Sequence, residues 1–160
     1  MTFVSPVAPQ AIVLRSIDRS QGPAGTALRQ SIEEALATRD WEGRGLNIYR
    51  RLSAALHRAS EEEGTHTSPE AVRRALDLLT ALPVTIPLPQ VVVESESEIG
   101  LDWDEGSRRV VSLTVRENPI VGYAAFFGAE PLYGRVPFLG ELPPTLRFLL
   151  ARLYPQRPGR

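Results

Sequence analysis

Residues 91–104 have the sequence VVVESESEIGLDWD, in which apolar and polar side chains alternate. Such alternation is typical of β-strands that have one face against a core and the other in water. Because about a dozen residues are long for a single strand, we expect a turn near residues 95–97 and therefore a hairpin. The side chains expected to face the core are Val91, Val93, Ile99, Leu101 and Trp103.

The chain after this hairpin continues with short apolar segments between turn signals. A turn at residues 104–106 leads to a strand at 109–116, and a second turn at 117–119 leads to strands at 120–127 and 132–138. Consecutive strands that are joined by short turns usually pair as an antiparallel meander. We therefore expect a meander of four or five strands.

A helix is expected at the C-terminal end, because leucines recur there at helical spacing. It opens at Pro143-Pro144 and is expected to cover one face of the meander. Its apolar stripe consists of Leu146, Leu149, Leu150 and Leu153.

Three further helices are predicted before the sheet, at residues 26–38, 46–59 and 69–82. The second is expected to begin after a pair of glycines and to end before an acidic run. The third has the clearest start, with Ser68 as N-cap and Pro69 in the first turn. Helices that come as one group and strands that come as another indicate the α+β class.

The whole chain, residues 1–160, is expected to form a single domain. Its segments are a leader with a short strand (1–25), a helical half (26–82), a sheet with its closing helix (89–154) and a loose tail (155–160).

Composition excludes several kinds of site. The chain has no cysteine, which rules out disulfides, thiolate zinc sites and cysteine nucleophiles. Its two histidines, His57 and His66, lack the spacing of a helical zinc motif.

The net charge is close to zero, because eighteen basic residues, all arginine, are balanced by nineteen acidic ones. The net charge of −1 does not favour binding to polyanions. With no apolar run of membrane length and no secretory signal at the start, we expect a cytoplasmic protein without a membrane partner.

The most biased segment is acidic. Alternate spacing is expected to place five carboxylates on one face of the sheet. This face is interpreted as a solvated surface, with an acidic docking surface and a divalent-metal or acid–base site as the alternatives. The five residues are Glu94, Glu96, Glu98, Asp102 and Asp104.

Aromatic and basic residues supply the other candidate contacts with a partner. Phe126 and Phe127 are consecutive, so they should point to opposite faces of a strand, and Tyr133 lies on the next strand. Arg147 and Arg152 give the last helix a basic bias that could dock an acidic partner or the acidic face of a second copy. A nucleic-acid partner is not favoured, because the only arginine among the aromatic residues of the sheet is Arg135.

Several short elements, taken in order, resemble a group of small bacterial proteins. Residues 41–45, Trp-Glu-Gly-Arg-Gly, are similar to the Trp-Asp-Gly-Tyr-Gly element of that group, and residues 71–83 to its helix ending in Leu-Pro. Residues 99–103 match its Ile-x-Leu-Glu-Trp strand except for Asp in place of Glu, and residues 142–154 its Leu-rich closing helix. The resemblance covers residues 40–154.

The sequence departs from that group in two places. Residues 46–67 look like an inserted helix, and Ser97 and Glu98 replace the glycines of a hairpin. The resemblance implies an antitoxin-like protein or an accessory subunit of a defence system that binds another small protein.

These observations together predict a non-enzymatic domain that binds another protein, one encoded by a neighbouring gene, or a second copy of itself. No catalytic, cofactor-binding or metal-binding residue is assigned, and no cofactor is expected. Two alternatives stay open. One is a metal-dependent hydrolase that uses Glu94, Glu96, Glu98 and Asp102, and the other is an aromatic sheet that binds single-stranded nucleic acid.

Overall fold

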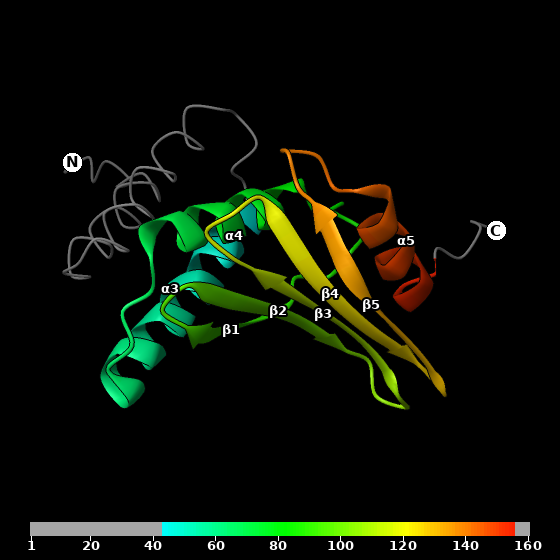
Figure 1. The fold of residues 1–160 in the computed structure, drawn as a ribbon, viewed down its shortest axis with the longest axis horizontal. Coiled ribbons are helices and arrows are strands. Elements are labelled where there is room, and N and C mark those ends of the chain that lie inside the picture. The colour runs from blue at the N-terminus through cyan, green and yellow to red at the C-terminus, as the bar shows by residue number, and fades with distance from the viewer. Residues whose placement is uncertain (1–42, 156–160) are drawn as a thin grey trace, which may run out of the picture.

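The computed structural model describes residues 43–155, in which three helices and five strands follow one another (Figure 1). The strand expected near residues 11–14, the helix expected at 26–38, Trp41 and the tail beyond 155 lie outside the described residues. In chain order the elements are α3 (Arg44–Glu63), α4 (Pro69–Ala81), β1 (Gln90–Ser95), β2 (Glu98–Asp104), β3 (Arg109–Val115), β4 (Ile120–Phe127), β5 (Glu130–Pro137) and α5 (Pro144–Leu153).

The strands form one antiparallel sheet in the order β1-β2-β3-β4-β5. This confirms the predicted meander and the α+β class. The hairpin predicted within residues 91–104 is also present, because Ser95 pairs with Glu98 across its turn. Each short connection holds its two strands side by side, so the order in the sheet repeats the order in the chain.

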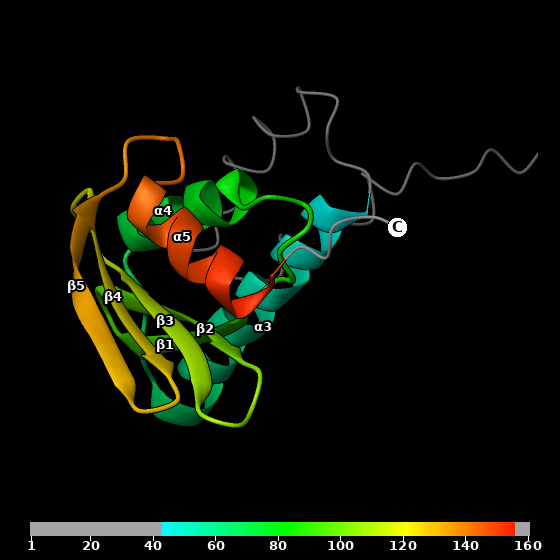
Figure 2. The same ribbon diagram turned by 90° about the vertical axis from the view of Figure 1, so that its right-hand side faces the viewer.

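One face of the sheet is covered by helices. Figure 2 shows α3, α4 and α5 together on the same side, where α3 contacts β1, α4 contacts β2 and β3, and α5 contacts β3. Leu101 and Leu113 are paired across β2 and β3 at the centre of this inner face, and both are fully buried. Trp103, expected in the core, is 2% exposed and donates from Nε1 to the carbonyl oxygen of Pro87 at 2.7 Å.

Helix α3 is longer than the sequence predicted. It begins at Arg44 rather than at residue 46, and it continues through the acidic run to Glu63. The helix ends at Gly64, which adopts the left-handed conformation (φ 65°) that ends many helices. Apolar spacing marks only the buried side of a helix, so it does not reveal the exposed turn at the C-terminal end of α3.

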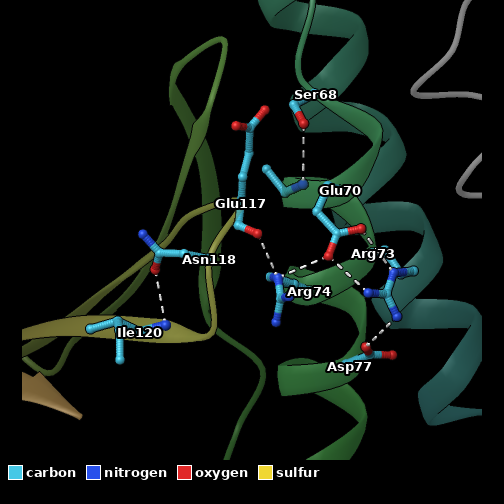
Figure 3. A network of polar contacts seen from close by, with 9 residues as sticks. Ser68, Glu70, Arg73, Arg74, Asp77, Glu117, Asn118 and Ile120 are labelled. Carbon is cyan, nitrogen blue, oxygen red and sulfur yellow. Dashed lines mark hydrogen bonds and ion pairs between the residues drawn. The ribbon is translucent and has the colours of Figure 1, made fainter. Parts of the chain in front are cut away.

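Helix α4 begins as predicted, with Pro69 in the first turn and Ser68 accepting a hydrogen bond from the backbone of Ala71 at 3.5 Å. Figure 3 shows a polar network on its outer side, in which the Glu70 carboxylate binds Arg74 at 2.9 Å. Arg74 also donates from Nε to the carbonyl oxygen of Glu117 at 2.8 Å. The first turns of α4 are thereby tied to the connection between β3 and β4.

Other arginines hold the connections between elements through backbone carbonyl groups. Arg44 of α3 donates to the carbonyl oxygen of Ile86 at 2.8 Å, and Arg51 donates to that of Pro89 at the same distance. Arg109 of β3 donates to two carbonyl oxygens in the last turn of α5, the shorter at 2.7 Å. A planar guanidinium group with five donors suits such contacts better than a lysine ammonium group does.

Candidate interaction surface

The side of the sheet away from the helices is named the outer face. Its side chains alternate along each strand with those of the core, as the pleat requires. The outer-face side chains differ from the core side chains in size and charge. Small residues occupy the middle of the outer face, and charged or aromatic residues surround these small residues. The main members are Val92, Glu94, Glu98, Gly100, Asp102, Asp104, Val110, Ser112, Thr114, Arg116, Gly122, Ala124, Phe126, Tyr133 and Arg135.

Glu94 lies across the outer face over Gly100. A Cβ atom at Gly100 would come within 2.7 Å of Oε1 of Glu94, so the absence of a side chain there makes room for the carboxylate. Partial burial raises the pKa of the Glu94 carboxyl group, and the carboxylates of Asp102 and Glu98 raise it further, against the opposing effect of Arg116. The Glu94 carboxylate has no hydrogen-bond partner among residues 43–155.

The other carboxylates on this face have partners within the chain. Glu98 pairs with Arg116 at 2.5 Å, and Asp102 accepts a hydrogen bond from the Ser112 hydroxyl at 2.6 Å. Asp104 accepts from the backbone amide of Gly106 at 2.8 Å and so closes the turn after β2. Within the described residues, these carboxylates of the outer face therefore make three separate polar contacts, while that of Glu94 makes none, and they do not form a shared cation site.

The five acidic residues do not all lie on the outer face, and this part of the prediction is wrong. Glu96 sits in the turn between β1 and β2, since Ser95 and Glu98 pair on either side of it. Among residues 43–155, no group of three or more His, Cys, Asp or Glu side chains could hold a metal ion. The hydrolase alternative consequently has no ligand set in this part of the chain.

A shallow depression of about 250 Å³ lies on the outer face over β3, β4 and β5. Its floor is low because β4 carries Gly122 and Ala124 there, and Nη1 of Arg116 lies 3.4 Å from the position that a Cβ atom on Gly122 would take. Tyr133 and Arg135 form its β5 side. The residues that line it are Ser112, Thr114, Arg116, Gly122, Tyr123, Ala124, Tyr133, Gly134 and Arg135.

Two aromatic side chains on the outer face are exposed, Tyr133 at 82% and Phe126 at 38%. Arg135, two residues after Tyr133, has no ion-pair partner among the described residues. Sequence reasoning singled out Tyr133 and Phe126 as contact residues but not Arg135. The signal in the sequence was the alternation of the strand, which places residues 133 and 135 on the same face. The structure shows that both lie opposite β4 positions occupied by alanine and glycine.

Phe127 and Phe126 point to opposite faces, as predicted for consecutive strand residues. The Phe127 ring lies on the helix-covered side, with the Arg152 guanidinium group 4.3 Å from its centroid. Arg152 also pairs with Glu130 at 2.7 Å, and this hydrogen bond lowers the pKa of the Glu130 carboxyl group. Phe127 and Arg152, which the sequence suggested as contacts with a partner, thus hold α5 against the hairpin of β4 and β5 instead. Arg147, in contrast, is exposed on α5.

Comparison of the chain with protein-family models, with characterised proteins and with solved structures gives no match. No helix within residues 43–155 is long and apolar enough to cross a lipid bilayer.

Proposed function

We propose that this chain is a non-enzymatic protein–protein interaction domain that binds its partner through the outer face. The observation that carries the proposal is a sheet face left uncovered by the described helices (Figure 2). On this face Tyr133 and Phe126 are exposed, and Arg135 has no ion-pair partner among residues 43–155. Tyrosine, phenylalanine and arginine are the residue types enriched at protein interfaces. The depression next to them gives a partner side chain a place to enter.

The face of the sheet is a better binding surface than its edges. Strand β5 contains a proline near each end, Pro131 and Pro137. A proline has no amide hydrogen to donate, so an edge strand with two of them discourages another strand from pairing with it. At the other edge, β1 is contacted by α3. A partner that adds a strand to the sheet is therefore disfavoured at the β5 edge.

The resemblance to small bacterial proteins adds a biological role to this proposal. An antitoxin-like protein or an accessory subunit of a defence system acts by binding, which requires a surface and no catalytic group. We extend the proposal to such a role in the cytoplasm, with a partner that is encoded by a neighbouring gene or is a second copy of the chain.

Co-expression of the full chain with the proteins encoded beside it tests this function, together with measurement of the mass of the purified chain. Tyr133→Asp should abolish whatever complex forms, because it places a charge on the most exposed aromatic side chain of the outer face. Phe148→Asp on α5 is the matched control, since Phe148 is also an exposed aromatic residue (61%) but lies on the helical side. A complex that survives Tyr133→Asp, or a chain that stays alone with every neighbour and does not self-associate, would contradict the proposal.

A further inference from the structure

We propose that the partner on the outer face is a second copy of this chain, packed face to face so that the acidic side of one sheet covers the arginine side of the other. This inference rests on the proposed function, because it names the partner of the same surface. The proposed dimer follows from the pairing register of the strands, because the register determines which residues of the two facing sheets would contact each other.

The central strand divides the outer face into two halves that correspond position by position. In one cross-strand row, Thr114 of β3 lies between Gly100 of β2 and Gly122 of β4. A two-fold axis parallel to β3 and lying between two facing sheets would place β2 of each copy over β4 of the other, and β1 over β5. Such an axis gives an isologous interface, in which every contact occurs twice.

This rotation brings Glu94 of one copy, which has no hydrogen-bond partner within residues 43–155, to Arg135 of the other, which has no ion-pair partner within the same range. Glu94 lies over Gly100, so in the dimer its side chain lies over Gly122 of the second copy. The same row ends with Arg135 on β5, next to Gly122. The Glu94 carboxylate of each copy thus enters the depression of the other copy, close to Arg135 and to the second cation, Arg116.

The neighbouring row is complementary as well. It places Asp102 of β2 opposite Ala124 of β4 in the second copy, where the exposed Tyr133 stands on the adjacent strand. A carboxylate on one copy again meets a small residue beside a hydrogen-bond donor on the other.

The other two-fold axis within the plane of the interface does not suit the charges. An axis perpendicular to the strands and passing through the Thr114 row would place β1 and β2 of one copy over the same strands of the other, with Glu94 facing its own counterpart and Asp102 facing Glu98. Like charges at such contacts are repulsive. The distribution of charge therefore selects the axis parallel to β3.

The size of the surface predicts a weak dimer. With strands about 4.8 Å apart and residues about 3.3 Å apart along each strand, five strands cover roughly 500 Å² per copy. The total of about 1,000 Å² lies at the lower limit of specific interfaces, so we expect a dissociation constant on the order of 10–100 µM.

Mixing two charge-reversed variants tests the proposal. Arg135→Glu places two glutamates opposite each other in its homodimer, and Glu94→Arg places two arginines opposite each other, so each variant alone should dimerise at least about tenfold more weakly than the natural chain. A mixed dimer contains one natural contact and one reversed contact, so mixing the two variants should restore association. Sedimentation velocity of the full chain, from about 5 µM to about 500 µM, measures this.

Two matched controls lie away from the outer face. Arg147→Glu on α5 and Glu62→Arg on α3 make the same changes of charge at exposed positions and should dimerise like the natural chain. Circular dichroism verifies that each variant is folded.

A chain that remains monomeric at about 500 µM would overturn this inference, as would variants that do not associate on mixing. If the monomeric chain nevertheless bound a different protein and lost that complex through Tyr133→Asp, the proposed function would stand and only the choice of partner would be wrong.

Discussion

The two faces of the sheet are built from the same five strands but from different kinds of residue. On the inner face, large aliphatic side chains such as Leu101 and Leu113 are fully buried by the helices. On the outer face, glycine, alanine, serine and threonine occupy the middle of the sheet, with carboxylates on one side and Tyr133 and Arg135 on the other. The contrast teaches that burial on the inner face stabilises the fold, whereas the outer face, left uncovered by the described helices, is the surface that we propose for recognition.

The largest difference between the two faces should appear in the free energy of unfolding when a central side chain on each face is truncated. Leu113→Ala removes a fully buried side chain and should lower the free energy of unfolding by about 3–5 kcal/mol. Thr114→Ala, one residue later on the opposite face, should change it by less than about 0.5 kcal/mol. Urea denaturation of the full chain measures both values. Equal losses would mean that the outer face is also part of the stabilising core.

A smaller effect is expected at the tryptophan of the inner face. Trp103→Phe keeps an aromatic ring in the core but removes the Nε1 donor and leaves the carbonyl group of Pro87 without its partner. Because Pro87 is exposed, the loss of about 1–3 kcal/mol should come mainly from the space that the smaller ring leaves in the buried site, and urea denaturation measures it. A loss below about 0.5 kcal/mol would show that the core closes around the smaller ring and that water replaces the donor.

The contact between β3 and the last turn of α5 should contribute a similar or slightly smaller amount. Arg109→Ala removes the donor to the carbonyl oxygens of Arg152 and Leu153 and should cost about 1–2 kcal/mol. Arg109→Lys should recover only part of this, because a single ammonium group does not reproduce the fork geometry. Arg147→Ala, at an exposed position on α5, is the control and should leave the denaturation midpoint unchanged.

The smallest effect belongs to the outer face and has the opposite sign. The raised pKa of Glu94 means that the folded chain binds the proton on this carboxyl group more tightly than the unfolded chain does. At pH 7 the charged form therefore lowers the free energy of unfolding, and Glu94→Gln should be slightly more stable than the natural chain. This advantage should shrink as the pH falls through the folded pKa and vanish below the unfolded value of about 4.3.

Paired denaturation curves at neutral and acidic pH, recorded at a protein concentration too low for dimers, measure the Glu94 effect. A Glu94→Gln variant that is less stable than the natural chain at pH 7 would show that the carboxylate makes a favourable contact in the monomer.

Alternation within residues 91–104 was sufficient to predict the sheet, because the period of a strand determines which side chains reach the core. It could not predict which residues occupy the tight turn. The turn places Glu96 between paired residues, which removes it from the face that the simple alternation assigned to it.

Features that depend on the exact register between neighbouring strands were not predictable from spacing alone. Gly100 and Gly122 matter because the register places them on either side of Thr114, and no local pattern reveals that relation. The clustering of arginines in the C-terminal part of the sequence also did not predict which arginine side chains lack an ion-pair partner among the described residues. Arg152 is paired with Glu130, whereas Arg135, which stands alone among apolar residues in the sequence, has no ion-pair partner in the described part of the chain.

Crosslinking at the proposed axis tests the central claim most directly, and the absence of cysteine makes it specific. Thr114→Cys places one thiol at the centre of the outer face, where facing sheets would be about 10 Å apart. Ala151→Cys, at an exposed position on α5, is the control. With a bis-maleimide of matching length, Thr114→Cys should yield a covalent dimer and Ala151→Cys should remain monomeric. Absence of the Thr114→Cys dimer, or equal yields from both variants, would contradict self-association through the outer face.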